Sequence, residues 1–372
     1  MTYSNTFRQG IPRSSTLRRF VELIAPCDDG ALEALAAEAA ATTRRHFGKT
    51  MRLFAPLYVS NECVNICSYC GFSGDNPIFR TTLTIDQVET EARHLAAEGF
   101  RSVLLVAGEH PKFTSPEYLS DCTRRLRTFI PSISIEVAPM ETPEYRKIVE
   151  AGAEGIVVFQ ETYNREAYAP LHTAGPKRDF DWRLDCPERA YAAGFRRIGI
   201  GALLGLVPWR TESLHLAAHA EHLLKHCWKA FLTISLPRLR PAASGFKPEH
   251  PLTDRDLAQL IFALRITFPQ IGLLLSTREP APIRDGLATL GITTMSAGSR
   301  TEPGGYTGEG RESLHRTQKG KAVALDPSEI ATASATVQFE IGDARTPGEV
   351  VSRLRQLGLD PVFKDWDTAI SP

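Results

Sequence analysis

The sequence predicts a (β/α)8 barrel, and three observations lead to this fold class. Short runs rich in β-branched and aliphatic residues recur along the chain of 372 residues. Amphipathic segments of helical length lie between most of these runs, which is typical of βα units and a parallel sheet. Eight such runs can be counted, and eight is the number of strands that closes this barrel. An open, doubly wound sheet is the alternative.

The strands are expected in order from residue 52 onward. The first is RLFAPLYVS, residues 52–60. The other seven are expected at 101–108, 132–139, 155–162, 197–205, 231–237, 271–277 and 292–298. Helical patterns such as TIDQVETEARHLAAEGF and TDRDLAQLIFALRITF separate them. Several of these patterns begin at a Thr or Asp, which caps a helix N-terminus, and end at Gly.

Segments at both ends extend the predicted barrel of residues 51–300. Residues 1–50 contain the Ala-rich pattern ALEALAAEAAATTRRHFG and predict an N-terminal helical extension. Residues 301–372 predict a loop and a small closing βα segment, with a strand at 336–343 (TVQFEIGD) and a helix in TPGEVVSRLRQLG. The Gly-rich stretch 299–322 is too long for a simple connector, so we expect either a lid over the barrel or disorder.

Charge and composition exclude several functional classes. Lys plus Arg (43) balance Asp plus Glu (43), so no electrostatic footprint for nucleic acid or an anionic membrane exists. The start, MTYSNTFRQGIPRSS, lacks the apolar core of a secretory signal, and we expect a cytoplasmic protein. In a reducing compartment, seven cysteines with one tight cluster indicate metal or redox chemistry before disulfides.

Three cysteines lie within NECVNICSYCGF, directly after the first expected strand. Cys63, Cys67 and Cys70 have the spacing C-x3-C-x2-C. They fall at the face of a barrel where βα loops build active sites. Three thiolates can hold three irons of a cubane cluster and leave the fourth iron open for a small molecule. A zinc site completed by His110 and simple buried thiols are the alternatives, but zinc sites usually show a second pair downstream.

The cluster motif, with Tyr69 before its last cysteine, resembles the signature of radical S-adenosylmethionine enzymes. PLYVSNECVNICSYCGF, FQETYNREAY, DFDWRL, LSTREP, SAGSRTEPGGY and PVFKDWD resemble the aromatic amino acid lyases of that superfamily, in particular the tyrosine lyases of thiamine biosynthesis. The resemblance implies a 4Fe-4S cluster and S-adenosylmethionine as cofactors. It also implies radical cleavage of the tyrosine Cα–Cβ bond to 2-iminoacetate and p-cresol, with 5'-deoxyadenosine and methionine as the other products.

The resemblance also implies which residues bind S-adenosylmethionine. They are Tyr69, Gly108, Glu109, Glu161 and Arg183. Glu109 would meet the amino group of the cofactor, Glu161 its ribose and Arg183 its carboxylate. A solvated Glu109 after the second strand, and a surface Arg183 paired with Asp181 or Asp185, are the plain alternatives.

A further set of residues is implied in binding the substrate. Arg278 ends the seventh strand and is assigned to the tyrosine carboxylate, with Ser276 and Ser296 as helpers, because bidentate Arg suits a carboxylate. Arg300 is the rival. Tyr58, near the end of the first strand, is expected between cofactor and substrate and is assigned with Arg278 to the catalytic machinery.

The resemblance implies partners and leaves some alternatives open. Thiazole synthase is the expected protein partner because iminoacetate hydrolyses readily, and flavodoxin or ferredoxin is the expected electron donor. The hydrogenase maturase that uses tyrosine looks similar but carries further cysteines after the barrel, whereas none follows Cys227 here. Tryptophan as the substrate, an electron-transfer iron-sulfur protein and a zinc-stabilised interaction module remain alternatives. The four isolated cysteines are expected to be small buried side chains in or beside helices: Cys27, Cys122, Cys186 and Cys227.

Overall fold

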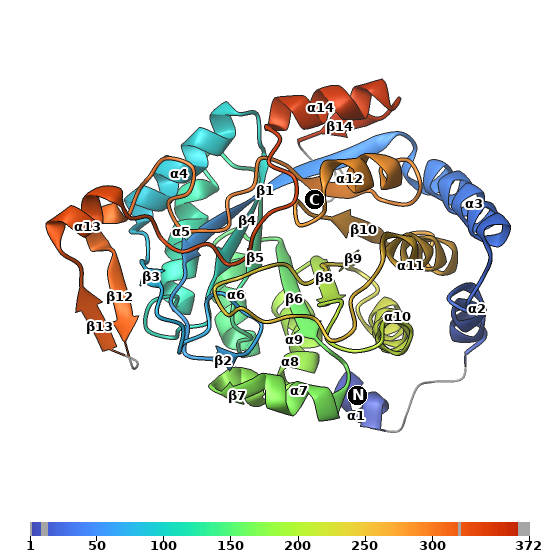
Figure 1. The fold of residues 1–372 in the computed structure, drawn as a ribbon, viewed down its shortest axis with the longest axis horizontal. Helices are drawn as coiled ribbons and strands as arrows, with labels where there is room; N and C mark the ends of the chain where they lie inside the picture. The colour runs from blue at the N-terminus through green and yellow to red at the C-terminus, as the bar shows by residue number, and fades with distance from the viewer. Residues whose placement is uncertain (1, 9–13, 319–320, 364–372) are drawn as a thin grey trace.

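A computed structural model of the chain describes residues 2–8, 14–318 and 321–363. Eight parallel strands form a barrel that closes where the last strand pairs with the first (Figure 1). In barrel order they are β1 (Thr50–Ser60), β4 (Ser102–Ala107), β5 (Ser132–Glu136), β6 (Gly155–Glu161), β8 (Arg197–Ala202), β9 (Phe231–Ser235), β10 (Gly272–Leu275) and β11 (Thr294–Ser296). The predicted barrel is confirmed and the open sheet is excluded.

Helices cover the outside of the barrel. Those that follow the strands are α4 (Ile85–Ala97), α5 (Pro116–Leu126), α6 (Thr142–Glu150), α7 (Arg165–Leu171), α8 (Phe180–Leu184), α9 (Cys186–Ala193), α10 (Trp209–His226), α11 (Asp254–Thr267) and α12 (Ala281–Leu287). The side chains of Thr84, Ser115 and Thr253 accept hydrogen bonds at the N-termini of α4, α5 and α11. These caps satisfy backbone N–H groups that a helix itself leaves open.

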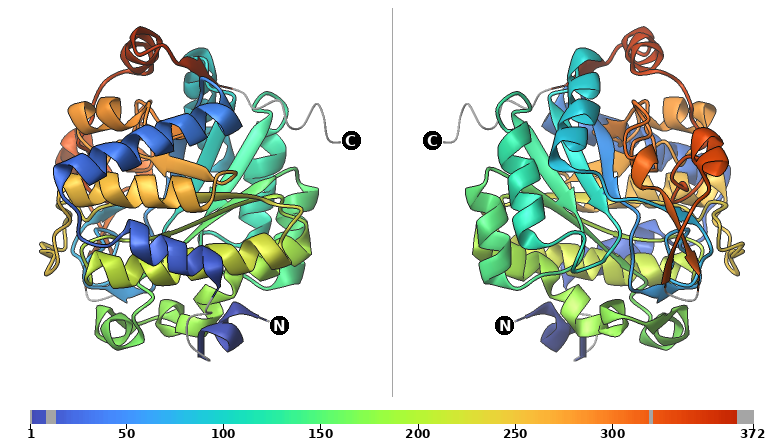
Figure 2. Two further views of the ribbon diagram at one scale, coloured as in Figure 1. Left: turned by 90° about the vertical axis from the view of Figure 1, so that its right-hand side faces the viewer. Right: turned by 90° about the vertical axis from the view of Figure 1, so that its left-hand side faces the viewer.

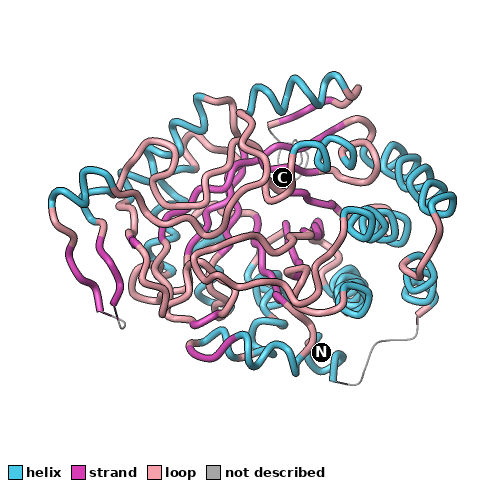
Figure 3. Tube along the Cα trace, in the orientation of Figure 1, coloured by secondary structure: helices cyan, strands magenta, loops and turns pink. Residues whose placement is uncertain are grey.

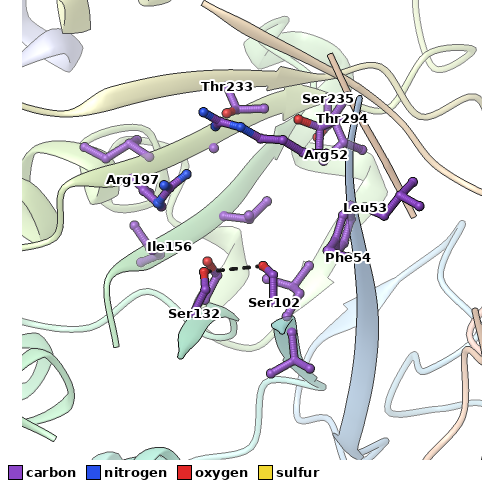
Figure 4. A pocket seen from close by; sticks show the side chains of 18 of the residues that line it. Arg52, Leu53, Phe54, Ser102, Ser132, Ile156, Arg197, Thr233, Ser235 and Thr294 are labelled. Carbon is purple, nitrogen blue, oxygen red and sulfur yellow. Dashed lines mark hydrogen bonds between the residues drawn. The ribbon is translucent and has the colours of Figure 1, made fainter. Parts of the chain in front are cut away.

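The strands alternate between an outer apolar face and an unusually small-residue inner face. Leu105, Ile135 and Ile198 are buried in the main hydrophobic core. The inner positions of the same strands instead carry residues such as Ser134 and Gly199, which line a cavity in the lower barrel. The small residues leave space between larger ones that also line it, such as Phe54 and Leu104, so a cavity remains inside the barrel. Figure 4 shows this cavity, which contains none of the cysteines.

Two small sheets hold the loops at the other end of the barrel. β2 (Ile66–Cys67) pairs with β7 (His172–Ala174), and β3 (Phe79–Arg80) pairs with β12 (His315–Gln318), which pairs with β13 (Lys321–Ala324). Loops cross in front of the barrel strands in the view of Figure 3. The cysteine loop is therefore fixed to the segment after α7 rather than free at its far end.

The terminal segments pack onto the barrel. α1 (Tyr3–Arg8), α2 (Ser15–Leu23) and α3 (Asp29–Phe47) precede β1, and α3 lies against α11 (Figure 2). At the other end, α13 (Pro327–Thr332) and α14 (Pro347–Gln356) lead to β14 (Asp360–Val362), which pairs with β1. Within the described residues, no helix is both long and apolar enough to cross a membrane.

The strand predicted at 336–343 is wrong. This stretch is an irregular segment whose N–H groups bond mainly to loops. Gln338 N donates to Thr301 O at 2.9 Å, Gly342 N to Thr277 O at 2.8 Å, and Thr336 N to Phe79 O of β3 at 3.0 Å. Apolar and polar residues alternate along the segment as in a strand, but the consecutive residues Gln338 and Phe339 both line one cavity, so the segment lacks the two faces of a strand.

The Gly-rich stretch 299–322, expected as a lid or as disorder, is largely ordered. The described part of 299–322 is a packed loop followed by β12 and the start of β13: Tyr306 Oη donates to Pro56 O at 2.7 Å, and the Thr307 N–H donates to Glu91 at 2.7 Å. Residues 319 and 320 lie outside the described residues.

The isolated cysteines are buried as expected, with one exception. Cys27 is only partly buried, because it lies in the short link between α2 and α3, whereas the other three are buried.

Candidate active site

The cysteine loop curls back on itself at the C-terminal end of β1. The Cys67 N–H donates to Ser73 Oγ at 3.0 Å, and the Asn76 side chain donates to the carbonyls of Cys70 and Gly71. Arg80, buried below the loop, donates to the carbonyls of Phe72 and Ser73 at 3.1 and 2.6 Å. These bonds to main-chain atoms fix the direction of the three thiols. Cys63, Cys67 and Cys70 line one cavity, and all three are free thiols.

The donor set of this cavity fits an iron-sulfur cluster. Burial, with Glu109 and Cys70 nearby, raises the pKa of Cys63 to about 11, so the thiols need a bound cation to become thiolates. Lys177 lowers the pKa of Cys67 and of Cys70 against the larger effect of burial. His110, proposed as a fourth zinc ligand, lines a neighbouring cavity and packs edge-on against Phe113. Three thiols without an adjoining histidine match the three protein ligands of an open cubane cluster.

A network of paired charges adjoins the thiols in the same cavity. Arg183 Nη1 lies 2.7 Å from Glu109 Oε1, and Lys177 Nζ lies 2.7 Å from Glu161 Oε1. Asn65 donates to the second Glu109 oxygen at 2.7 Å. Burial alone would raise the pKa of Glu109, but Arg183 and Lys177 outweigh it and the pKa is lowered. Two ionised carboxylates and two cations therefore line the cavity beside the thiols.

The backbone at Glu161 is held in an uncommon conformation. Its φ of 70° is the only positive value at a non-glycine residue in the described part of the chain. The register between β6 and β8 shifts between Phe159 and Glu161, so the strand bulges at its end. Such strained residues persist where surrounding contacts hold them, and they gather at functional sites. The bulge directs the Glu161 carboxylate toward Lys177.

Arg183 is not a surface residue, and neither of its two expected partners holds it. Asp181 pairs with Arg165, and Asp185 accepts hydrogen bonds from Ser4. The buried Arg183 guanidinium instead donates to Phe159 O at 2.6 Å as well as to Glu109. The solvated alternative for Glu109 is likewise wrong.

Two other predicted cofactor residues lie around the loop in supporting positions. The Tyr69 hydroxyl bonds to His172 Nε2 at 2.7 Å in a buried contact, on the side of the loop away from the thiol cavity's lining. A side chain at Gly108 would place its Cβ 2.3 Å from Glu62 O. Glycine is therefore required there for the loop after β4 to approach the cysteine loop.

The predicted substrate residues share a second cavity beside the first. Tyr58, Ser276, Arg278 and Ser296 all line it. The Arg278 guanidinium lies over the Phe339 ring, 3.3 Å from its centroid. Arg300, the rival cation, is exposed and does not contribute to this lining. The lower part of the cavity is apolar: Phe54, Leu104, Val157 and Leu274.

The two cavities meet at residues that the sequence did not single out. Gln338 and Glu136 line both, and Tyr58 Oη donates to Gln338 Oε1 at 2.7 Å. Lys177, which lies in the cofactor cavity, was also missed. Lys177 lies in the short 3-10 helix η1 (Pro176–Arg178) and Gln338 in an irregular segment. Neither belongs to a motif, so only the fold brings them to the site. Glu136 is the last residue of β5 and continues the inward-facing series of Ser132 and Ser134. Its place at the C-terminal end of a barrel strand could have marked it as a site residue from the sequence.

Comparison with known proteins identifies the family. The 2-iminoacetate synthase of Escherichia coli (strain K12) is 39% identical over 347 residues, covering 93% of this chain and 86% of that protein. The chain belongs to the 2-iminoacetate synthase family. Its Salmonella typhimurium member is 38% identical over the same length.

Two family models match this member of the 2-iminoacetate synthase family, and both agree with the cysteine cavity described above. Residues 57–217 match the Radical SAM superfamily, and residues 235–360 match the Biotin and Thiamin Synthesis associated domain. The chain is thus a radical S-adenosylmethionine enzyme, and the 4Fe-4S cluster and S-adenosylmethionine expected from the sequence are its cofactors.

Solved structures give the same family fold. The FeFe-hydrogenase maturase HydG from Carboxydothermus hydrogenoformans superposes with a TM-score of 0.83 at 34% identity, covering 95% of this chain and 77% of that chain. Methylornithine synthase (PylB), at 20% identity and a TM-score of 0.68, covers 94% of this chain and 97% of its own and shows the fold alone.

Proposed function

We propose that this radical S-adenosylmethionine enzyme cleaves the Cα–Cβ bond of tyrosine, giving 2-iminoacetate and p-cresol for thiazole formation in thiamine biosynthesis. The observation that carries the proposal is the pair of joined cavities: one contains the three thiols, and the other has Arg278 near its mouth and an apolar floor. An aromatic amino acid suits this second cavity, with its carboxylate at the guanidinium and its ring on the floor. The name 2-iminoacetate synthase, carried by relatives over 93% of the chain, supports the same reaction.

The chain supplies placement and charge for this reaction. When bound, the reduced cluster and S-adenosylmethionine would supply the chemistry of hydrogen-atom abstraction. Cys63, Cys67 and Cys70 would hold the cluster, and the charged groups around Glu109 and Arg183 would orient the amino acid end of the cofactor. The gain from such positioning is large, because the reacting atoms are held in contact within a site that excludes water.

Arg278 orients the substrate in this proposal. Burial lowers the pKa of Arg278 while Tyr58 and Glu136 raise it, and the group remains a cation near neutral pH. Its stack on Phe339 fixes the guanidinium plane. Ser276 and Ser296 lie on the same wall, although Ser296 Oγ already accepts from the Thr277 N–H at 3.1 Å. Ser296 therefore acts mainly by fixing the end of β10.

We extend the proposal to partners and location. Iminoacetate hydrolyses in water, which favours direct transfer to a thiazole synthase. A flavodoxin or ferredoxin is proposed as the electron donor, and the cytoplasm as the location. Because the net charge is zero, we expect local surface features, and not overall charge, to determine where these partners dock.

An anaerobic turnover assay tests the proposal. The reconstituted protein is supplied with dithionite, S-adenosylmethionine and either tyrosine or tryptophan, and 5'-deoxyadenosine and p-cresol are quantified. We expect both products with tyrosine and little 5'-deoxyadenosine with tryptophan. An intact cluster with neither product would overturn the proposal, and preference for tryptophan would reassign the substrate.

A further inference from the structure

Glu136 carries a half-buried carboxyl group at the boundary between the two cavities. It ends β5 and pairs in register with Val106 of β4, which pairs in turn with Tyr58 of β1. Glu136 and Tyr58 therefore lie at the same level of the barrel, on strands separated by one other. The Glu136 side chain contributes to the lining of the thiol cavity and of the substrate cavity. In the second of these it is the only carboxylate among the lining residues.

No other part of the described structure accounts for this carboxyl group. Glu109 and Glu161 each have a cation at 2.7 Å, whereas no hydrogen bond or ion pair to the Glu136 side chain is present among the described residues. A carboxyl group that faces an enclosed cavity without a protein partner becomes costly when a ligand displaces the solvent there, and such groups are found where a ligand uses them. A ligand that reaches both cavities would bring its own partner for Glu136.

We propose that Glu136 binds the α-ammonium group of the substrate and accepts a proton from it. This inference rests on the proposed function, because it takes an aromatic amino acid as the ligand. With the substrate carboxylate at Arg278 and the ring on the apolar floor, the amino group has to face the thiol cavity. Glu136 is the anionic group in the substrate cavity that lies along this boundary.

The proton transfer is chemically needed before the radical step. An ammonium nitrogen has no lone pair, so loss of a hydrogen atom from it would leave an aminium radical cation, which keeps its positive charge beside the protein's cations and has no lone pair to stabilise the radical. A neutral amine gives a nitrogen radical that its lone pair stabilises. The balanced step moves one proton: the Glu136 carboxylate becomes a carboxylic acid and the substrate ammonium becomes an amine. No oxidant or further reactant is required.

The surroundings of Glu136 suit a proton acceptor that works near neutral pH. Burial raises its pKa to about 7, with Glu161 acting in the same direction; Arg278, Arg183 and Lys177 oppose the shift. A base whose pKa lies near the working pH is the most effective for proton transfer. Tyr58, which also faces it, has a pKa raised well above its usual range and stays neutral.

Glu212 shows that a raised pKa alone does not define such a role, and it provides a matched control. Burial raises its pKa to about 7 as well. Its two oxygens, however, accept from Thr162 Oγ1 and from the Tyr163 N–H, both at 2.7 Å. Glu212 lies on α10, outside both cavities, so its protonation has no path to the substrate.

The test compares wild type, Glu136→Gln and Glu212→Gln as anaerobically reconstituted holoenzymes. The first measurement is calorimetry of tyrosine binding with S-adenosylmethionine present and no reductant, in buffers of different ionisation heat, which counts protons. At pH 6, wild-type Glu136 is largely protonated and must release close to one proton when it binds the ammonium. At pH 8 the release should be near zero. Glu212→Gln should match wild type, and Glu136→Gln should lose the difference.

The second measurement is the pH dependence of turnover. Wild-type kcat/KM should rise through about pH 7, because this ratio reports the ionising groups of the free enzyme, and Glu136→Gln should lose at least 100-fold in kcat together with the rising limb of kcat/KM. A Glu136→Gln enzyme with wild-type turnover and an unchanged proton count overturns the inference while the lyase function stands. Wild type that binds tyrosine without turnover contradicts the proposed function, and the proton count still decides the role of Glu136. Wild type that does not bind tyrosine overturns both.

Discussion

Buried charges in the cofactor cavity are paired with one another, and this pairing decides how single substitutions act. Glu109 with Arg183 and Glu161 with Lys177 each lie at 2.7 Å, with side chains at most 13% exposed. Removing one member of such a pair leaves the other charge buried and unpaired, which is more damaging than the loss of the contact itself. The three thiols differ, because they remain neutral until iron binds.

Substitution of Cys67 by Ala should abolish cluster assembly. The variant keeps only two of the three thiolates that hold the cluster. Cluster binding is coupled to deprotonation of the cysteine ligands, so the loss of one ligand weakens assembly strongly. Iron and sulfide content and visible absorbance after reconstitution check this, with 5'-deoxyadenosine formation falling to background. Cys122→Ala is the control, since Cys122 is buried in α5 far from the thiol cavity's lining. Equal iron content in Cys67→Ala and wild type would contradict the assignment.

Arg278→Ala should weaken tyrosine binding strongly while iron content stays normal. Loss of a buried cation that pairs with a carboxylate costs about 3 kcal/mol, roughly a 100-fold increase in Kd. Tyrosine affinity by calorimetry on the holoenzyme measures this. Arg300→Ala, at an exposed position, should leave the affinity within about twofold. The reverse ranking of the two variants would return the role to Arg300.

The sequence predicted the residues that belong to motifs and missed those that only the fold brings in. Cys63 and Glu109 could be placed because each follows a recognisable strand. Lys177 lies in the single 3-10 turn η1 after β7, and Gln338 lies in the irregular segment after α13. Neither is part of an element long enough for a periodicity that indicates which side chains face inward. Arg183 could be named by resemblance, yet its burial and its partner needed the structure.

At the scale of elements, hydrophobic periodicity predicted strands well inside the barrel and failed outside it. The first half of β1 alternates in burial, while β4 reads SVLLVA and is apolar throughout its middle, as a strand buried on both faces is. Residues 336–343 alternate in sequence, yet the consecutive residues Gln338 and Phe339 both line the substrate cavity and the backbone bonds mainly to loops. The sequence alone does not distinguish this extended cover from a strand, because its apolar residues also recur with a period of two.

Gly342→Ala should disturb this cover and the substrate site beneath it. A Cβ at Gly342 would lie 2.6 Å from Arg278 O and 2.9 Å from Pro280 N, both main-chain atoms that cannot move alone. We expect a lower thermal midpoint and weaker tyrosine binding, by at least fivefold. Gly348→Ala is the matched control, since nothing lies within 4 Å of its Cβ and it is in the first turn of α14. It should be neutral or stabilising by up to about 1 kcal/mol. Equal behaviour of the two variants would contradict a tight fit at Gly342.

At the scale of the whole molecule, the barrel was predictable because strand count and helix spacing are local signals. The closing contact, where Arg52 pairs with Thr294, joins distant residues and follows from the count alone. The strand β14, which pairs with the start of β1, was not predicted, because a strand of three residues is too short to show a pattern. Long-range pairing of short strands depends on packing that sequence patterns do not record.

Buried titratable groups give the global stability two opposing dependences on pH. Burial lowers the pKa of His172 to about 4 and of His219 to about 3. These neutral histidines favour folding above the usual histidine pKa and lose that contribution as the pH falls below it. Glu136 and Glu212, whose pKa values rise to about 7, act oppositely and lose stability as the pH rises from about 4.5. The net curve between pH 4.5 and 6.5 should therefore be shallow.

Removing one of these histidines should change the pH dependence of the free energy of unfolding measurably. His219, 2% exposed, stacks on Tyr3 and bonds to the Tyr163 hydroxyl, so it ties α10 to the N-terminal segment. At pH 5 the unfolded chain protonates this residue and the folded chain does not, which costs wild type about 2 kcal/mol relative to pH 7.5. His219→Gln should lose less stability than wild type over that interval, by this amount, in urea unfolding at both pH values.

The exposed His46 supplies the control for this measurement. His219→Gln is expected to be less stable than wild type at pH 7.5, because it loses the stack on Tyr3, so only the difference between the two pH values is informative. His46→Gln should follow wild type at both. If His219→Gln and wild type lost equal stability on acidification, His219 would be protonated in the folded protein and the α1 contact would have to tolerate a buried cation. The surroundings of His219, with the Tyr163 hydroxyl as hydrogen-bond partner and Tyr3 stacked on its face, argue that it does not.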